Sequence, residues 1–289
     1  MPPKKKGKAD GTAAQGTKPA PDWPALTPLI PEMDLTLEDV MPGQIVTIPN
    51  FWTATLCKAY VSFLSSLPLT TTPGKPKKGD AVRVNDRFQV DDPAFAERLW
   101  SQTSLKSLVE AQPKELWGGD VVGLNPNIRI YRYSKGQFFD QHCEQHDDSN
   151  NVTLSGTPPM QARTTWTLLL YLTSPATGCI GGETVFYPDS PKKKSRDALP
   201  EPIVASLEVG LALLHRHGAD CMLHEGREVL EGEKWVCVHV LEDKASIPLH
   251  LEKHQIFKGR ELGTRIAADK LFSISGLVEG LRAEANGAF

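Results

Sequence analysis

Two metal-binding residue types, a histidine and a carboxylate, stand two positions apart at His142 and Glu144. Residues i and i+2 of a β-strand point to the same face, so both side chains are placed to bind one metal ion as adjacent ligands. The candidate for a third ligand is His224, which would come from a distant strand. Two histidines and one carboxylate leave three coordination positions open, the arrangement of non-haem Fe(II) centres that react with dioxygen.

A lysine follows this candidate ligand set in the chain. Lys234 comes ten residues after His224, in Gly232-Glu233-Lys234-Trp235. A buried cation near such a metal suits a dicarboxylate co-substrate such as 2-oxoglutarate. One end of that molecule binds the iron, and the far carboxylate needs a Lys or Arg and a hydroxyl group. Tyr133 is the candidate for the hydroxyl.

These residues lie in a part of the chain that reads as short strands separated by turns. In the segment 128–133, alternation places Ile128 and Ile130 on one face and Arg129, Tyr131 and Tyr133 on the other. Helical spacing of apolar residues predicts helices before and after this part. Many short strands with turn residues between them predict a sandwich or barrel, so the fold class is mainly β with flanking helices. The expected strands are 44–48, 128–133, 164–172, 183–187, 209–214, 221–223 and 235–240, and the expected helices are 53–67, 94–110 and 265–285.

The chain resembles the prolyl 4-hydroxylase-like branch of the 2-oxoglutarate/Fe(II) oxygenases over roughly residues 44 to 240. The resemblance implies a double-stranded β-helix (jelly-roll) core, Fe(II), 2-oxoglutarate as co-substrate and often ascorbate. It also implies that His142 and His224 bind the metal and that Lys234 and Tyr133 bind 2-oxoglutarate. The matching segments are Tyr131-Arg132-Tyr133 with Gly136-Gln137-Phe138-Phe139 and His142, Leu170-Tyr171-Leu172, Gly181-Gly182-Glu183-Thr184-Val185-Phe186, and His224-Glu225-Gly226 with Gly232 and Lys234-Trp235.

The carboxylate ligand departs from the family pattern, which is usually His-x-Asp. The pair His142/Glu144 keeps the family's distance from Gly136 and replaces Asp with Glu, and we favour it. Two alternatives stay open: His146 with Asp148, which needs a bulge in the strand, and His142 with Asp147. If none of these histidine–carboxylate pairs binds a metal, the chain would be a non-catalytic relative that binds peptide without iron.

Other histidines and cysteines are expected to be structural. We assign His239, His250 and His254 to this class. His215 and His217 are expected in the core or on the surface, with a position next to a metal ligand as the alternative. Cys143, between the candidate ligands, is expected to face the opposite side of its strand and to belong to the core.

Composition limits the partners and the compartment. The net charge of −3 gives no reason to expect nucleic-acid or membrane binding, and no apolar run is long enough to cross a membrane. The five cysteines are scattered, and no signal peptide is apparent after the lysine cluster at 3–8, so we expect a cytoplasmic or nuclear protein. The resemblance favours a prolyl residue of a protein or peptide as substrate. A nucleic-acid base or a small metabolite is the alternative, and the basic segments 75–78 and 192–194 are its only support.

The chain divides into three expected parts. Residues 1–34 are rich in Lys, Gly, Ala and Pro and are expected to be a disordered basic tail. Residues 35–245 form the expected oxygenase domain, with a helical part at 35–120 and the β-helix core at 121–245. Residues 246–289 are an expected, partly helical extension.

Overall fold

A computed structural model describes residues 20–72, 81–144, 151–152, 160–188 and 200–244 of the 289-residue chain. The alternative ligands His146, Asp147 and Asp148 lie outside the described residues. So do His250, His254, the lysine cluster, the two basic segments and the C-terminal extension.

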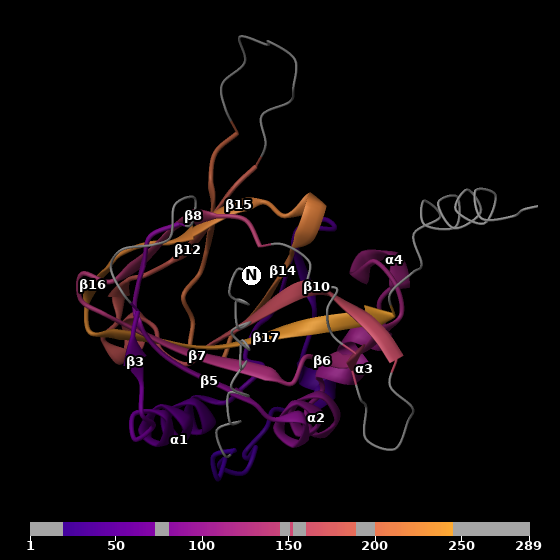
Figure 1. The fold of residues 1–289 in the computed structure, drawn as a ribbon, viewed down its shortest axis with the longest axis horizontal. Coiled ribbons are helices and arrows are strands. Elements are labelled where there is room, and N and C mark those ends of the chain that lie inside the picture. Colours follow the sequence, from indigo (N-terminus) through magenta and orange to yellow (C-terminus); the bar gives the residue numbers. More distant parts are fainter. Residues whose placement is uncertain (1–19, 73–80, 145–150, 153–159, 189–199, 245–289) are drawn as a thin grey trace, which may run out of the picture. The chain divides into compact units, whose positions relative to one another are not determined.

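The larger of two main antiparallel sheets forms one layer of the fold (Figure 1). Its central strands β14, β10, β17 and β7 pair in that order, although they come from distant parts of the chain. Two further short strands, β6 (Val121–Leu124) and β9 (Asn151–Val152), pair with β17 and β10. The full order of the path is β1 (Glu38–Met41), β2 (Ile45–Ile48), β14 (Ala212–Arg216), β10 (Met160–Tyr171), β17 (Glu233–Lys244), β7 (Asn127–Ser134), β5 (Asp86–Asp91) and β3 (Thr70–Thr71).

The smaller sheet provides the opposite layer and carries the first candidate ligands. Along the chain, consecutive core strands alternate between the sheets: β7, β10, β14 and β17 lie in the larger one, and β8, β12 with β13, and β15 in the smaller. This alternation is the topology of a double-stranded β-helix, as the resemblance implied. The strand order is β13 (Ile203–Ala205), β12 (Thr184–Tyr187), β15 (Leu223–Gly226), β8 (Phe138–His142) and β4 (Arg83–Val84); a separate pair joins β11 (Ile180–Gly181) to β16 (Val229–Glu231).

Helices cover the outer face of the larger sheet (Figure 1). The predicted helix 53–67 is α1 (Ala54–Leu64), which begins where the Thr53 side chain accepts a hydrogen bond from the Leu56 amide. The predicted helix 94–110 is two helices, because Thr103 is extended between them. They are α2 (Pro93–Gln102) and α3 (Leu105–Glu110), followed by α4 (Lys114–Trp117); three 3₁₀ turns are η1 (Glu32–Asp34), η2 (Pro175–Thr177) and η3 (Gly218–Asp220).

Strand alternation sorts the core into two clusters. Ile128 and Ile130 belong to the cluster on the helix side, while Tyr133 is buried in the cluster between the sheets, as the sequence predicted. Strand β17 is divided in the same way: Trp235 and Cys237 pack toward the helices, and Val236 and Val238 pack inside. Residues that alternate with the helix-side core therefore point into the space between the two sheets.

The folded part begins earlier than predicted. Trp23 and Leu26, which we assigned to the tail, are buried at 8% exposure. Trp23 stacks on Phe95 with ring centroids 4.2 Å apart, and its Nε1 donates to Asp92 Oδ2 over 2.8 Å. The boundary at residue 35 is therefore wrong: two apolar side chains in a Pro-rich segment form no periodic pattern, yet they complete the core over α1 and α2.

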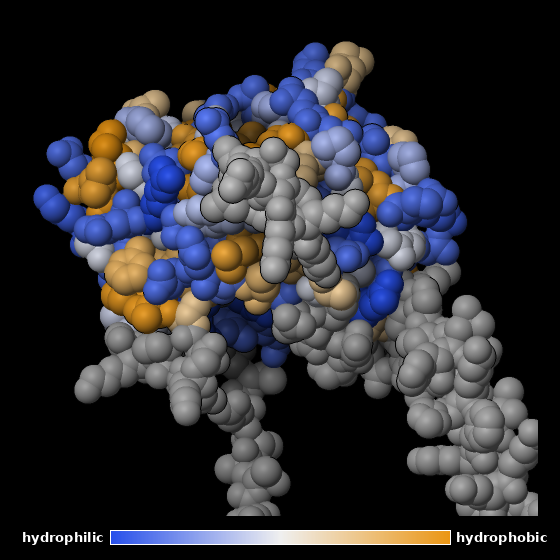
Figure 2. All heavy atoms as spheres, turned by 90° about the horizontal axis from the view of Figure 1, so that it is seen from above, coloured by the Kyte–Doolittle hydropathy of each residue, from blue (hydrophilic) through white to orange (hydrophobic). Residues whose placement is uncertain are grey.

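The outer surface mixes polar and apolar residues. Figure 2 shows one face on which hydrophilic and hydrophobic residues are interspersed. The large hydrophobic side chains exposed in the described part come from separate elements: Met33, Val40, Ile180, Val204 and Leu230. None of the described helices is both long and apolar enough to span a membrane.

Candidate metal centre

The first two candidate ligands face each other across the smaller sheet. His142 ends β8 and His224 lies in β15; the two are Cα partners, and their ring centroids are 4.2 Å apart. Nδ1 of His142 lies 2.8 Å from the Asp140 carbonyl oxygen, and Nδ1 of His224 lies 2.9 Å from that of Met222. A carbonyl oxygen only accepts, so each Nδ1 carries the proton and each Nε2 keeps a lone pair for a metal.

Both rings are held in the neutral form that metal binding requires. Burial lowers the pKa of His142 to about 4, and the neighbouring His224 lowers it further in the same direction. Burial also lowers the pKa of His224. Neither ring therefore has to lose a proton before it binds a metal near neutral pH.

Glu144 follows β8 and is fixed through both its main chain and its side chain. Its amide donates to Cys221 Sγ over 3.2 Å, and its carbonyl oxygen accepts from the Gly218 amide over 2.8 Å. The Thr167 hydroxyl donates to Glu144 Oε2, which also lies 3.7 Å from His217 Nδ1. These contacts fix the carboxylate on the inner side of the larger sheet.

The Glu144 carboxyl is ionised. Burial acts to raise its pKa, but the hydrogen bond with His217, the nearby His215 and the hydrogen bond from Thr167 together hold the pKa well below its usual range. An ionised carboxylate is the form that binds a cation. The sequence analysis gave no metal-related role to Thr167.

The three side chains converge. The ligand atoms of His142, Glu144 and His224 all lie within 4.8 Å of one another. Nitrogen and oxygen ligands lie about 2.0–2.2 Å from a bound metal ion, so the three side chains must close in further to bind the same ion. Two histidines and one carboxylate form the donor set expected for Fe(II).

Lys234 and Tyr133 lie beside this group. They are Cα partners on β17 and β7, and Lys234 is buried. Lys234 Nζ donates to the Gly182 carbonyl oxygen over 2.6 Å and lies 3.5 Å from Thr184 Oγ1. Burial lowers the pKa of this ammonium to about 8. Among the described residues, no carboxylate forms an ion pair with Lys234, so the space beside it suits an anionic group.

Further residues around the lysine were not predicted from the sequence. The Tyr171 ring centroid is 5.2 Å from Lys234 Nζ, and the Tyr171 hydroxyl donates to Thr184 Oγ1 over 2.7 Å. Both residues lie in segments that matched the family, but we assigned no role to either. Strand 164–172 was expected to be buried, and burial on both faces did not show that Tyr171 points toward the site.

His215 and His217 were expected in the core or on the surface, and both are buried beside candidate ligands. The His215 ring centroid is 4.5 Å from that of His224, and burial lowers the pKa of His215 to about 3. His217 contacts Glu144. His239, which we expected to be structural, is buried near Phe95 on the helix side. Cys143 was predicted to be in the core, and this is wrong: it is exposed, because it directly follows the end of β8.

Two cavities meet at Glu144. One connects the candidate metal ligands with the lysine and is lined by Tyr133, His142, Glu144, Thr184, His224 and Lys234 among others. The other has a volume of about 620 Å³ and is lined mainly by polar residues of β5, β7 and their surroundings, with His217. Its size lies within the typical range for small-molecule sites, about 300–1,000 Å³. Glu144 lines both cavities.

Comparison with known proteins gives one similar sequence. No family model matches the chain. A curated protein of Arabidopsis thaliana, probable prolyl 4-hydroxylase 4, is 30% identical over 125 residues, covering 38% of this chain and 39% of that protein. The chain thus spans about two fifths of the length of this relative. The similarity confirms the resemblance to prolyl 4-hydroxylases that the sequence motifs indicated.

Solved structures of oxygenases also align with the chain. A prolyl 4-hydroxylase of Pseudomonas putida is 14% identical with a TM-score of 0.47, covering 70% of this chain and 94% of the other. A prolyl hydroxylase of Trichoplax adhaerens, in complex with a hypoxia-inducible-factor peptide fragment, is 15% identical with a TM-score of 0.47, covering 70% and 84%. HygX of Streptomyces hygroscopicus, with nickel and 2-oxoglutarate bound, is 16% identical with a TM-score of 0.45, covering 69% and 83%. TM-scores below 0.5 support no conclusion about the site, and the fold rests on the strand order.

Proposed function

We propose that this protein is an Fe(II)- and 2-oxoglutarate-dependent dioxygenase that hydroxylates a C–H bond of a prolyl residue in a protein or peptide. One observation carries the proposal. A single cavity is lined both by His142, Glu144 and His224, whose ligand atoms lie within 4.8 Å of one another, and by the buried cation Lys234. Metal and dicarboxylate could therefore bind side by side.

The donor set fits Fe(II). Two neutral imidazoles present their Nε2 lone pairs, and an ionised carboxylate supplies the negative charge. Iron, when bound here, supplies the dioxygen chemistry that no side chain can perform. The role of the protein is to hold the ligands in place. Thr167 and His217 orient Glu144, and two main-chain carbonyl groups orient the rings.

The surroundings of Lys234 fit the far carboxylate of 2-oxoglutarate. Its ammonium group is the cation, and the Thr184 hydroxyl group lies 3.5 Å from it. The Tyr133 ring centroid is 5.7 Å from Lys234 Nζ, and Tyr133 lines the same cavity. Burial raises the pKa of Tyr133, so its hydroxyl group keeps its proton. The carboxylate would receive charge-assisted hydrogen bonds in a site closed to bulk water.

The larger cavity supports a peptide as the substrate. Arg129 Nε donates to Asn127 Oδ1 over 3.0 Å, and Gln89 also lines this cavity. Arg129 forms no ion pair with any described carboxylate, so part of its guanidinium group is available to acceptors such as main-chain carbonyl oxygens. The prolyl target itself rests on the similarity to the Arabidopsis thaliana relative.

The test is whether 2-oxoglutarate turnover is coupled to hydroxylation of a peptide. The protein is reconstituted with Fe(II), with and without ascorbate, and assayed with 2-oxoglutarate and proline-containing peptides. We expect succinate together with a peptide heavier by one oxygen atom. H142A and H224A should abolish both products, whereas Q141A, at an exposed position beside His142, should not. Bound peptide without bound iron or succinate would instead identify a non-catalytic relative.

A further inference from the structure

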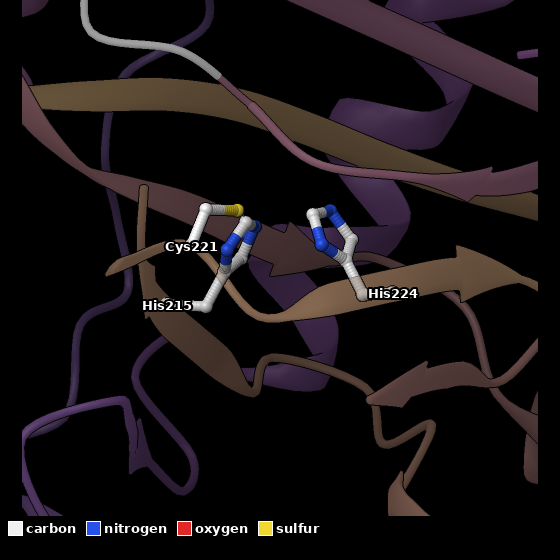
Figure 3. Close-up of side chains that lie close together, drawn as sticks. All are labelled: His215, Cys221 and His224. Carbon is white, nitrogen blue, oxygen red and sulfur yellow. The ribbon is translucent and has the colours of Figure 1, made fainter. Parts of the chain in front are cut away.

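A second group of metal-binding side chains shares His224 with the first. The ligand atoms of His215, Cys221 and His224 lie within 4.8 Å of one another (Figure 3). This group consists of two imidazoles and one thiol, whereas the first consists of two imidazoles and one carboxylate. His215 and Cys221 lie beside the candidate iron ligands but belong to a different donor group.

The fold places these three residues together from neighbouring elements. His215 lies in β14 of the larger sheet, and its ring centroid is 4.5 Å from that of His224 in β15. Cys221 directly follows η3, the short turn that connects these two strands. His215 is 2% exposed and His224 is 4% exposed, so two of the three side chains are enclosed by protein. The site is therefore a pocket between strands and not a surface cluster.

The sulfur atom is already held in position. Cys221 Sγ accepts a hydrogen bond from the Glu144 amide over 3.2 Å. Burial raises the pKa of the Cys221 thiol, so the sulfur keeps its proton until a metal ion displaces it. The same hydrogen bond joins Cys221 to the main chain of Glu144, a candidate iron ligand. A shift of either residue is therefore expected to move the other.

We propose that His215, Cys221 and His224 form a second metal site, which binds Zn²⁺ and competes with Fe(II) for His224. Thiolate and imidazole ligands suit Zn²⁺, with bonds of about 2.3 and 2.0–2.1 Å, and a water molecule can complete a tetrahedron. Binding releases the thiol proton to solvent. His224 Nδ1 is bound to the Met222 carbonyl oxygen, so only Nε2 is available and it serves one metal at a time.

The consequence for the proposed oxygenase is inhibition by zinc. A zinc ion bound by His215 and Cys221 also binds His224. The candidate iron site then keeps only two ligands, His142 and Glu144. This second step rests on the proposed function, but the zinc site itself does not.

Cobalt(II) substitution tests the site without any activity assay. Co²⁺ bound to a thiolate gives an intense near-ultraviolet charge-transfer band, and Co²⁺ bound only to nitrogen and oxygen does not. We expect the band in the wild-type protein, its loss in C221S, and its retention in E144Q, which changes only the first group. C143S is the matched control, because Cys143 is exposed and neighbours the same strand end.

Two outcomes would overturn the site. One is cobalt binding to the wild type, measured by equilibrium dialysis, without the band. The other is a band that survives in C221S and disappears in C143S. Circular dichroism checks that each variant is folded. In the activity assay, C221S should raise the Zn²⁺ concentration for half-inhibition about tenfold or more, as expected for the loss of one metal ligand. If no variant shows oxygenase activity, the proposed function fails while the cobalt result still decides on the zinc site.

Discussion

Lys234 stands directly opposite Tyr133 on the neighbouring strand, and both side chains are at most 6% exposed. The ammonium group is thus surrounded by aromatic rings, a carbonyl oxygen and a hydroxyl group, with no carboxylate partner in the described part of the chain. A buried cation of this kind costs stability and is expected where an anionic ligand must bind. The first two predictions follow from this pair.

Removal of the lysine should change how stability depends on pH. The pKa of Lys234 is lowered by burial to about 8 from its ordinary 10.5. Between these values the unfolded chain keeps a proton that the folded protein has released, so the lysine's contribution to stability rises with pH. The free energy of unfolding of the wild type, minus that of K234M, should increase by about 3 kcal/mol across this range. Urea unfolding at a series of pH values measures the free energy of unfolding of both proteins. A difference between them that stays constant with pH would contradict the prediction.

Co-substrate affinity should depend on pH through the same group. We expect wild-type affinity for 2-oxoglutarate, measured by calorimetry with Mn²⁺ in place of iron, to fall as pH rises through about 8. K234R keeps its charge over this range, so its affinity should stay level. K234M should bind weakly at every pH. Identical pH profiles for the wild type and K234R would show that the ammonium group does not hold the co-substrate.

Thr167 should control metal affinity without touching the metal. Its hydroxyl donates to Glu144, so T167V removes a group that orients a ligand. Removal of such an orienting group typically lowers metal affinity about 10–100-fold. T165V is the control, because Thr165 is also buried and its hydroxyl group has no hydrogen-bond partner in the described part. Competition with a fluorescent chelator gives the affinities; equal losses in the two variants would assign Thr167 a general packing role.

Gly210 should tolerate no side chain. Its φ is +81°, and a Cβ atom would lie 1.9 Å from the Trp52 carbonyl oxygen. Because G210A combines backbone strain with a clash against main chain just before β14, we expect it to cost about 3–5 kcal/mol of folding free energy. G43A, at a φ of +70° with nothing near the added carbon, should cost only about 1 kcal/mol. Thermal unfolding compares the two, and similar losses would contradict the clash.

The sequence allowed the site to be predicted wherever local spacing was enough. Alternation in 128–133 placed Tyr133 on the inner face, as in the structure. The i, i+2 spacing suggested the pair His142 and Glu144, although β8 ends at His142 and Glu144 follows it. Local spacing could not predict which distant strands pair. His224 meets His142 because β15 pairs with β8, and Lys234 meets Tyr133 because β17 pairs with β7. Neither register was predicted; the family resemblance implied only that these four residues share one site.

The residues that were missed were missed for several physical reasons. Thr167, Tyr171 and His215 lie on strands that are buried on both faces, so burial alone did not mark them as facing the site. Trp23 lies in a segment whose Pro-rich composition predicted disorder, yet its ring stacks on Phe95 and its Nε1 donates to Asp92. Cys143 was misplaced because β8 ends one residue before it, and alternation no longer applies beyond a strand end.

Glu144 is the one described residue that lines both the candidate co-substrate compartment and the candidate substrate compartment. The two compartments are otherwise lined by different residues: Lys234, Thr184 and Tyr133 on one side, and Gln89, Asn127 and Arg129 on the other. If the proposed function holds, replacements at Gln89 or Arg129 should change which molecule is accepted without altering the candidate metal ligands. Substrate selectivity could therefore evolve through residues that do not bind the metal. Glu144 is the exception, because it lines both cavities.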